Sequence, residues 1–573
     1  MLNMSDSALK NDKFQRINTL AAFTSKQRTD QDTLRKGIML NMSDSALKND
    51  KFQRINTLAA FTSKQRTDQD TLRKGIMLNM SDSALKNDKF QRIFRIVLPL
   101  SLLYISWIVF TGRLYIDDLG RSLYGYTSWG QDGRPASDLL MSALSFGTPI
   151  LDITPLPQIL SVIALSAVLS LWGVKYLPRK GTTSSAVCVL YFILSPFFLE
   201  NISYRYDSLP MSLSLVALLL PYALKKKPWS PFLHFISVIA SLSFYQASIS
   251  LFILLMIIDV IHLYFSKKDD LRHLEIIKSI AINTLAFAAG FVFYKVLIAS
   301  SFASGSYSDE HSKIINVDHT FFDVLYNNTV VIFTWLLNPL YKCSPFLFKG
   351  CALILLVSII KISMTSKDVK SRVINLFLLS ALITAGFFSC FAHIALLKTP
   401  VLAPRVLISF TGFFLLFAYL VVQAFESKKI QLILLAPVVF FSFILSFSYA
   451  NASSSQKELD KLISTSIYND ISHQDLSFKN VFIHGVMPTS KQRALIVERL
   501  PIMNSLIPIY LNNNWSWGAM ILKHYLLDYN VDATITDPKK EICSLTPFSR
   551  SKDYSLYSKG DTLIVSFDKT GCR

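Results

Sequence analysis

A series of long apolar runs constrains this chain more than any other feature of its sequence. There are about eleven of them, and most approach the 20 residues that a helix needs to cross a hydrocarbon layer. Hydrophobic residues make up 51% of the chain and charged residues only 17%, which is a membrane composition. We therefore predict an α-helical polytopic membrane protein with spans near residues 93–112, 159–174, 183–200, 208–224, 231–247, 249–265, 279–299, 346–363, 373–394, 406–425 and 430–449.

The net charge of +19 follows the same pattern and does not indicate a nucleic-acid partner. Lysine and arginine gather in short groups between the apolar runs, at 225–227, 266–272, 367–372 and 428–429. Cytoplasmic loops of membrane proteins collect positive charge, so these groups orient the spans. Because basic residues also precede the first run, we predict a cytoplasmic N-terminus and a C-terminal segment on the outer side.

Residues 1–92 form an arm that precedes the first apolar run. Residues 1–38 recur without change as 39–76, and a third copy continues from Met77 until Phe94 replaces the asparagine found at Asn18 and Asn56. Natural repeat folds drift in sequence, and this segment has too few apolar residues for a core. We interpret it as a passenger segment from duplicated coding DNA or an upstream start codon. The alternative is a cytoplasmic arm with its own function.

Two adjacent carboxylates, Asp117 and Asp118, follow the first run by a few residues and are predicted to lie on the outer side. Carboxylates at a membrane surface are costly to desolvate and tend to be functional. Transfer of a sugar from a lipid phosphate to a hydroxyl needs such a general base at the membrane boundary. The alternative is a helix cap or an ion pair with Arg113 or Arg121.

The outer segments also hold groups that could bind a phosphate or a sugar. The cationic candidates are Arg134, Arg205, Lys398 and Arg405, although Arg205 could pair locally with Asp207 and Arg405 could extend to the interface. Sugars stack on aromatic rings, and the outer aromatics could equally form the aromatic belt of the interface. They are Tyr124, Tyr126, Trp129, Tyr204, Tyr206, Trp515 and Trp517.

The sequence gives no indication of a metal or nucleotide cofactor. No Cys-x-x-Cys spacing is present. His311 and His319 near Asp309 and Glu310 could form a metal site, but we favour a solvated charged loop because no helical spacing aligns them as ligands. The chain also has no Walker loop and no Gly-x-Gly-x-x-Gly that opens a helix after a strand. These absences argue against ATP-driven transport and against a nucleotide-sugar fold.

The chain changes character after residue 450. Residues 451–573 mix helical patterns (456–467 and 516–529) with strand patterns (480–484 and 562–566), which predicts a small α/β domain on the outer side. Cys543 and Cys572 both lie in this segment, and we expect them to form a disulfide if it faces an oxidising compartment.

Several ordered motifs between Phe94 and the last run resemble those of the Gtr glucosyl transferases, often phage-encoded enzymes that modify O-antigen and convert serotype. The motifs are Tyr115-Ile-Asp-Asp-Leu-Gly-Arg121, Gly125-Tyr126, Trp129, Gly133-Arg-Pro135, Pro155-Leu-Pro-Gln-Ile159, Ser203-Tyr-Arg-Tyr-Asp-Ser-Leu-Pro210, Tyr245-Gln-Ala-Ser248 and Pro404-Arg-Val406. The repeats of the N-terminal arm depart from the family pattern.

The resemblance implies a GT-C fold in the bacterial inner membrane, with catalysis in the first periplasmic loop. The implied donor is undecaprenyl-phosphate-glucose and the implied acceptor is a lipid-linked O-antigen repeat unit, with a donor flippase and a donor synthase as pathway partners. It implies Asp117 and Asp118 as catalytic carboxylates and Arg205, Gln246 and Arg405 as donor contacts. We also predict substrate-binding roles for six further residues: Arg121, Arg134, Asp207, Lys398, Tyr126 and Trp129. We predict no cofactor, and the sequence does not show whether the reaction depends on a metal.

Two other functions share these substrates. A flippase for a lipid-linked saccharide needs charges near mid-membrane and symmetry between halves, and the sequence shows neither. An O-antigen polymerase or ligase joins whole glycans and would change chain length instead of adding one hexose per repeat unit.

A chain that starts at Met77 or Met80 should keep full transferase activity, because the removed copies have no core and precede the first span. Activity of the full-length and shortened chains at equal membrane abundance measures this. A large loss in the shortened chain would contradict the interpretation of residues 1–92 as a passenger segment.

Overall fold

A computed structural model describes residues 88–178, 181–224, 228–266, 272–305, 310–366, 368–474, 476–532 and 534–568. All of them belong to the unit that begins at Lys86. The predicted arm at 1–92 lies almost wholly outside these residues. Cys572, the expected partner of Cys543, also lies outside them, so that disulfide stays a prediction.

Seven helices in the described part of the chain are long and apolar enough to cross a membrane. They are Asp88–Thr111, Leu156–Tyr176 (α5), Gln246–Phe265 (η2, Gln246–Ser248, with α10, Leu251–Ser266), Leu274–Phe302 (within α11, Arg272–Phe293, η3, Tyr294–Ala299, and α12, Ser300–Phe302), Pro345–Ser363 (α16), Val369–Ala395 (α17) and Lys428–Ser472 (α19). Each overlaps a predicted run, although several extend beyond it. The prediction of a helical membrane protein is therefore confirmed.

Four shorter apolar helices occupy the remaining predicted runs: Thr182–Ile193 (α6), Ser208–Ala223 (α8), Ser230–Phe244 (α9) and Phe410–Ala424 (α18). At 1.5 Å per residue, helices of this length do not by themselves cover a hydrocarbon layer of about 30 Å. The run at 183–200 is interrupted because Pro196 cannot donate a backbone N–H, and helix resumes as α7, Phe198–Ser203. The count of about eleven spans stays a prediction.

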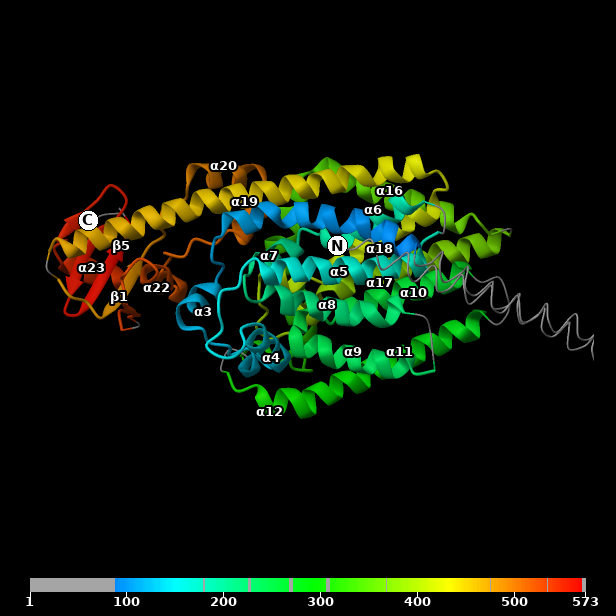
Figure 1. The fold of residues 1–573 in the computed structure, drawn as a ribbon, viewed down its shortest axis with the longest axis horizontal. Coiled ribbons are helices and arrows are strands. Elements are labelled where there is room, and N and C mark those ends of the chain that lie inside the picture. The colour runs from blue at the N-terminus through cyan, green and yellow to red at the C-terminus, as the bar shows by residue number, and fades with distance from the viewer. Residues whose placement is uncertain are drawn as a thin grey trace, which may run out of the picture. The chain divides into compact units, whose positions relative to one another are not determined.

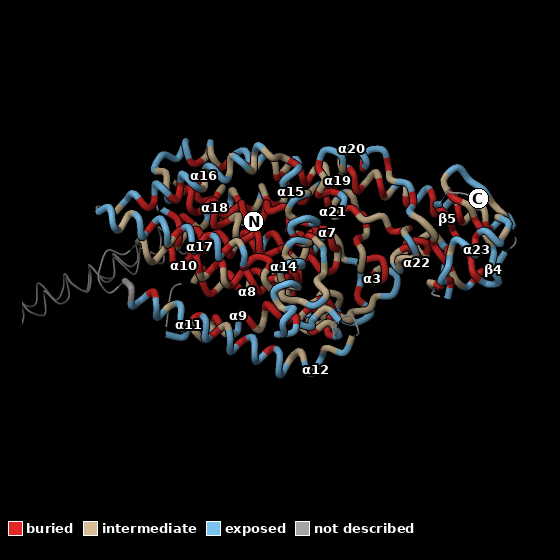
Figure 2. Tube along the Cα trace, turned by 180° about the vertical axis from the view of Figure 1, so that it is seen from behind, coloured by how far each residue is buried: buried red, intermediate tan, exposed pale blue. Residues whose placement is uncertain are grey.

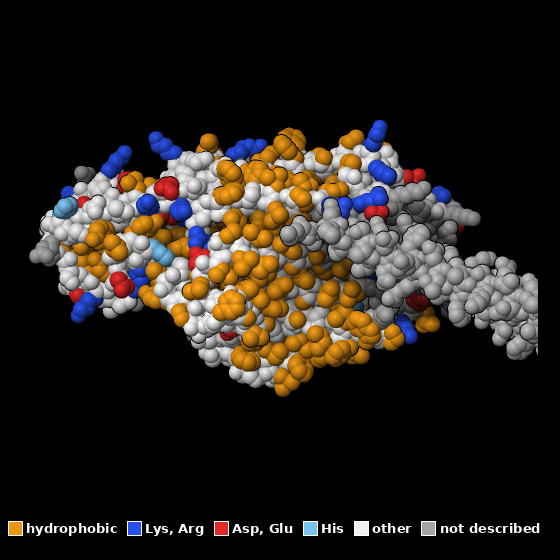
Figure 3. Space-filling view, viewed as in Figure 1, with side chains coloured by type: hydrophobic (Ala, Val, Ile, Leu, Met, Phe, Trp, Pro, Cys, Tyr) orange, Lys and Arg blue, Asp and Glu red, His pale blue; other side chains and the backbone are white. Residues whose placement is uncertain are grey.

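The helices pack into a bundle with a continuous buried interior (Figure 2). Helix α8 packs on α5 and α9, and α18 packs on α6 and α16. Helix α18 also packs on α10, and a small residue lets the two approach closely, since a Cβ atom on Gly412 of α18 would lie 2.5 Å from Leu251 of α10. On the face drawn in Figure 3, hydrophobic side chains gather over the bundle and charged ones toward its ends, as expected for a surface in contact with lipid.

Helix α19 joins the bundle to the C-terminal segment. It is 45 residues long, or about 68 Å at 1.5 Å per residue, and includes both the last predicted run and the tail helix predicted at 456–467. The position where we placed a domain boundary, residue 450, therefore lies inside one continuous helix (Figure 1).

The C-terminal segment contains a five-stranded sheet in the order β2-β1-β5-β4-β3. The central strands β1 (Asn480–His484) and β5 (Thr562–Ser566) are parallel, cover the two predicted strands and are flanked by β2 (Asn530–Val531), β4 (Ser555–Lys559) and β3 (Ser549–Arg550). Its helices are α20 (Lys491–Arg499), α21 (Met503–Leu506), α22 (Ser516–Lys523) and α23 (Pro538–Ser544). The prediction of a small sheet in the C-terminal segment is thus confirmed.

Connecting helices gather at the end of the bundle that meets this segment. They include α3 (Asp118–Tyr124), η1 (Gly130–Asp132), α4 (Pro135–Leu144) and η5 (Pro404–Leu407). Between α12 and α16 the chain forms a helical segment made of α14 (Phe321–Ile332), η4 (Phe333–Leu337) and α15 (Asn338–Cys343). In both Figure 1 and Figure 2, α3 lies between the bundle and α22.

A buried ion pair fastens the loop before α3 to helix α19. The Arg113 guanidinium lies 2.9 Å from the Asp460 carboxylate, and it also donates to the Pro508 carbonyl at 2.7 Å. The two charged side chains are only 5% and 4% exposed, so each compensates a charge that would otherwise be buried alone.

Removal of one member of this pair should destabilise the protein. Arg113→Ala leaves Asp460 buried without its cation, and we expect the free energy of unfolding to fall by about 3–5 kcal/mol. The double variant Arg113→Met with Asp460→Leu should recover most of that loss because no charge stays buried. Thermal unfolding in detergent micelles measures both, and equal melting temperatures for Arg113→Ala and the wild type would contradict the prediction.

Candidate active site

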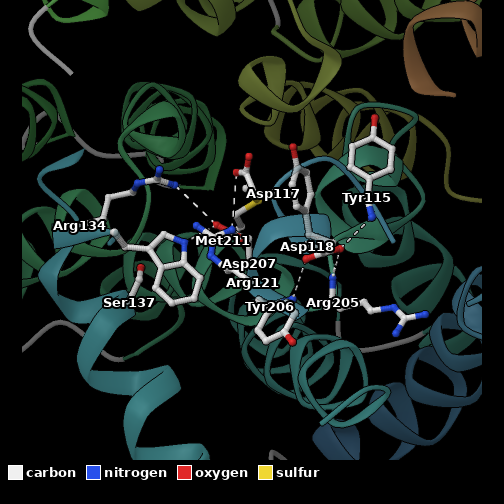
Figure 4. Close-up of polar contacts among 12 residues, drawn as sticks. Tyr115, Asp117, Asp118, Arg121, Arg134, Ser137, Arg205, Tyr206, Asp207 and Met211 are labelled. Carbon is white, nitrogen blue, oxygen red and sulfur yellow. Dashed lines mark hydrogen bonds and ion pairs between the residues drawn. The ribbon is translucent and has the colours of Figure 1, made fainter. Parts of the chain in front are cut away.

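The two predicted carboxylates begin helix α3, at the end of a tight turn. Ile116 has a φ of 48°, a left-handed conformation that a β-branched residue rarely adopts. Asp117 then stands at the N-cap position, although its side chain does not cap the helix, and Asp118 is the first helical residue. The turn therefore decides where each carboxylate points, and the two point to different partners (Figure 4).

Asp118 is fully buried and holds two segments of backbone together. Its Oδ2 accepts the N–H of Tyr115 at 3.1 Å and that of Arg205 at 2.9 Å, and its Oδ1 lies 3.4 Å from the N–H of Tyr206. Burial raises the pKa of Asp118 to about 7, against the lowering effect of the Arg205 N–H. The position and contacts of Asp118 are those of a structural carboxylate.

Asp117 is the more accessible carboxylate, with 35% of its side chain exposed. It lies 3.6 Å from the Arg121 guanidinium, which is beyond ordinary hydrogen-bond length. The loss of solvent around its less exposed part raises the pKa of Asp117, while the charge of Arg121, and then those of Arg405 and Arg134, oppose the rise. An accessible carboxylate with a raised pKa and weak contacts is suited to accept a proton.

Arg121 is fixed behind Asp117 by Asp207. Its guanidinium donates to Asp207 Oδ2 at 2.7 Å and lies 4.1 Å above the Trp129 ring, whose N–H donates to Asp207 Oδ1 at 2.6 Å. We placed Trp129, Tyr204 and Tyr206 among the outer aromatics that could stack on a sugar, but all three are buried, and the Trp129 indole belongs to this network. Arg121, Asp207 and Trp129 are thus placed to orient the site and not to contact a substrate.

Arg134 and Gln246 meet at the loop around Gly133. Arg134 donates to Asp132 at 2.7 Å and lies 3.8 Å from Asp207. Gln246 donates to the Asp132 carbonyl at 2.6 Å and contacts the Tyr294 hydroxyl at 3.1 Å. Gln246, predicted as a donor contact, therefore supports the backbone beside Arg134, whereas 14% of the Arg134 side chain is exposed.

Arg405 is held by Glu200, a residue that was not among the predicted site residues. Glu200 is buried and accepts both the backbone N–H and the guanidinium of Arg405, each at 2.7 Å. The Arg405 side chain is 20% exposed and lies 5.8 Å from the centre of the Tyr204 ring. An acidic residue at the end of the apolar run 183–200 was the available signal, because such a residue needs a cation nearby.

The other predicted groups lie apart from this network or at its margin. The Arg205 side chain pairs with Asp152 and with the Gly112 carbonyl, not with Asp207, and in Figure 4 it extends away from the cluster. Lys398 is exposed, and its backbone N–H donates to the Lys313 carbonyl at 2.8 Å. Tyr126 is half-buried with its ring centre 5.7 Å from the Arg121 guanidinium, so it borders the site.

Another buried acid lies elsewhere in the described part of the bundle. Asp259 of α10 accepts a hydrogen bond from the Tyr176 hydroxyl at 2.7 Å. The functional polar groups were predicted on one side of the membrane only, and Asp259 was not among the candidates. Its position within an apolar run was the signal that could have identified it.

Comparisons with known proteins agree with the sequence resemblance. Residues 107–416 match the family described as glucosyl transferase GtrII. The chain is also 31% identical over 490 residues to a protein of Salmonella phage P22 described as an uncharacterized 55.3 kDa protein in the gtrB 5′ region. That match covers 82% of this chain and 98% of the phage protein. No solved structure gives a significant match.

The burial of Asp118 predicts a pH dependence of stability. The folded state raises its pKa from about 3.9 to about 7, so the folded protein binds the extra proton between these values. Stability should therefore fall as pH rises through this window, by on the order of 4 kcal/mol, and stay level above it.

Asp118→Asn keeps an acceptor for the two shorter N–H bonds and removes the titration. Its melting temperature in detergent should change less between pH 5 and 8 than that of the wild type. Asp323→Asn, at an exposed position of α14, is the matched control. Parallel curves for wild type and Asp118→Asn would contradict the assignment of this titration.

Proposed function

This chain belongs to the GtrII glucosyl transferase family, and on that premise we propose that it transfers glucose, or a related hexose, from undecaprenyl-phosphate-sugar to O-antigen repeat units. In this proposal the reaction takes place on the periplasmic face of the bacterial inner membrane and converts serotype. The N-terminus is cytoplasmic and the C-terminal domain periplasmic. A donor synthase and a donor flippase supply the lipid-linked sugar.

One observation carries the proposal: Asp117 is an accessible carboxylate of raised pKa at the end of a membrane bundle, among three arginines. Asp117 takes the proton of the acceptor hydroxyl while that oxygen bonds to the anomeric carbon of the sugar. The bond from that carbon to the phosphate oxygen breaks, and the lipid phosphate leaves with the electron pair. The end of the bundle suits this step because the donor's lipid tail stays in the bilayer.

Arg405 and Arg134 are the proposed phosphate contacts. Arg405 pairs with Glu200 and Arg134 pairs with Asp132, and the side chain of each arginine is still partly exposed. Such preorganised cations stabilise a leaving phosphate without having to reorganise during the reaction. The Arg121 side chain is only 5% exposed, and its charge instead opposes the rise in the pKa of Asp117. Arg205 and Lys398 are assigned no phosphate contact.

The C-terminal domain is proposed to help hold the acceptor. Its half-buried Trp515 and Trp517 and the exposed Tyr124 on α3 lie on the two elements that meet at this end, α22 with its N-cap and α3. Aromatic faces stack on the apolar C–H faces of sugars. These residues supply such surfaces beside the carboxylate.

The function is tested by replacing Asp117 and Asp118 with Asn separately in a strain that carries the O-antigen pathway. Wild type should add one hexose per repeat unit, measured by mass spectrometry of the O-polysaccharide against a strain without the gene. Asp117→Asn should reduce transfer by about 10²–10⁴-fold, because it removes the general base. Asp118→Asn should retain more activity, since it alters only the hydrogen bonds that hold the backbone at Tyr115 and Arg205 and leaves the general base in place.

Exposed Asp323→Asn is the control and should behave as wild type. Transfer at the wild-type level by Asp117→Asn would remove the assignment of Asp117 as the general base, and transfer at that level by both variants would remove a catalytic role for either carboxylate. A change of chain length without an added hexose would instead identify a polymerase.

A further inference from the structure

The helix that carries Asp117 is packed partly by the C-terminal domain. Leu119 of α3 is fully buried in the apolar core of the C-terminal domain, a cluster that also includes Ile463 and Ile467 of α19. Leu114 and Ile116, which precede the carboxylates, pack against the same core. The α3 segment therefore has one face toward the bundle, through Asp118, and one face inside the C-terminal domain.

A single hydroxyl of that domain holds the strained turn. Tyr510 Oη donates to the Leu114 carbonyl at 2.8 Å and accepts the N–H of Ile116 at 3.2 Å. Ile116 is the residue in the left-handed conformation immediately before Asp117. A strained backbone conformation persists only where surrounding contacts enforce it, and here the contact on the Ile116 N–H comes from about 390 residues along the chain.

A second residue of the C-terminal domain, His524, contacts α3 itself. The His524 Nε2 atom lies 3.0 Å from the Leu119 carbonyl and 3.4 Å from the Ser122 hydroxyl. Burial lowers the pKa of His524, which favours the neutral ring, so its Nε2–H donates to the carbonyl. Tyr510 thus contacts the segment just before Asp117, and His524 contacts the segment just after it.

We propose that Tyr510 and His524 are positioning residues through which the C-terminal domain fixes the direction of the Asp117 carboxylate. This proposal rests on the proposed function, since it names what aims the catalytic base. Loss of the Tyr510 hydroxyl frees the Ile116 N–H and lets the turn relax toward ordinary backbone angles. The carboxylate then leaves the line between the acceptor hydroxyl and the sugar, and small displacements of this kind lower the rate steeply.

The test compares Tyr510→Phe with Tyr554→Phe in the purified full-length chain. Tyr554 is a matched control because it is also buried in the C-terminal core, yet its hydroxyl bonds Asp470 of α19 at 2.8 Å and does not reach α3. Transfer is measured with undecaprenyl-phosphate-glucose as donor and membranes that carry the lipid-linked repeat unit as acceptor. Tyr510→Phe should lower kcat by about tenfold to a hundredfold and leave KM for the donor within about twofold.

Hydrogen exchange supplies a readout that does not depend on activity. Amides of the peptide 113–119 should exchange faster in Tyr510→Phe than in wild type and in Tyr554→Phe. Wild-type kcat together with wild-type exchange in Tyr510→Phe would overturn the proposal. Equal losses of kcat in Tyr510→Phe and Tyr554→Phe would also overturn it, because the effect would then be a general loss of stability.

A second pair of variants keeps the test decisive if Tyr510→Phe fails to fold. His524→Ala removes the donor to Leu119, whereas His524→Gln offers an amide N–H in its place. Lower kcat in His524→Ala with recovery in His524→Gln supports positioning, and wild-type kcat in His524→Ala contradicts it. Absence of transfer in the wild type itself would reject the proposed function, and the exchange measurement would still decide whether Tyr510 holds the turn.

Discussion

The candidate site depends on one buried carboxylate that satisfies backbone N–H groups from two distant segments. Asp118 joins the turn at Tyr115 to the loop at Arg205 and Tyr206, so α3 and the segment before α8 share one acceptor. Buried N–H groups without a partner are costly, and a carboxylate accepts several of them at once. Asp118 is buried in this role, whereas the side chain of its neighbour Asp117 is accessible.

The arginines near Asp117 are likewise paired with acceptors that compensate the cost of burial. Arg121, Arg134 and Arg405 are each paired with a carboxylate, namely Asp207, Asp132 and Glu200. Charges at low exposure persist when they are paired and hydrogen-bonded. The pairs fix the directions of the guanidinium groups before any substrate arrives, which is the kind of preorganisation that charge stabilisation during group transfer requires.

Both parts of the described chain contribute to α3. The bundle supplies the loop that Asp118 binds, and the C-terminal domain supplies Tyr510, His524 and the apolar core around Leu119. Helix α19 is common to both parts and contributes Asp460 to the buried pair with Arg113. The C-terminal domain is therefore part of the structure that shapes the site, in addition to its proposed contact with the acceptor.

Local patterns in the sequence determined the membrane class, the positions of the apolar helices and strands β1 and β5, and they indicated a candidate site at Asp117 and Asp118, because hydrophobic periodicity and charge are readable along the chain. Tertiary structure alone decided which carboxylate is accessible, that Trp129 is buried, and that Glu200 holds Arg405. It also decided that α19 continues past residue 450. Those features depend on residues from distant segments, whose proximity one sequence does not encode in any local pattern.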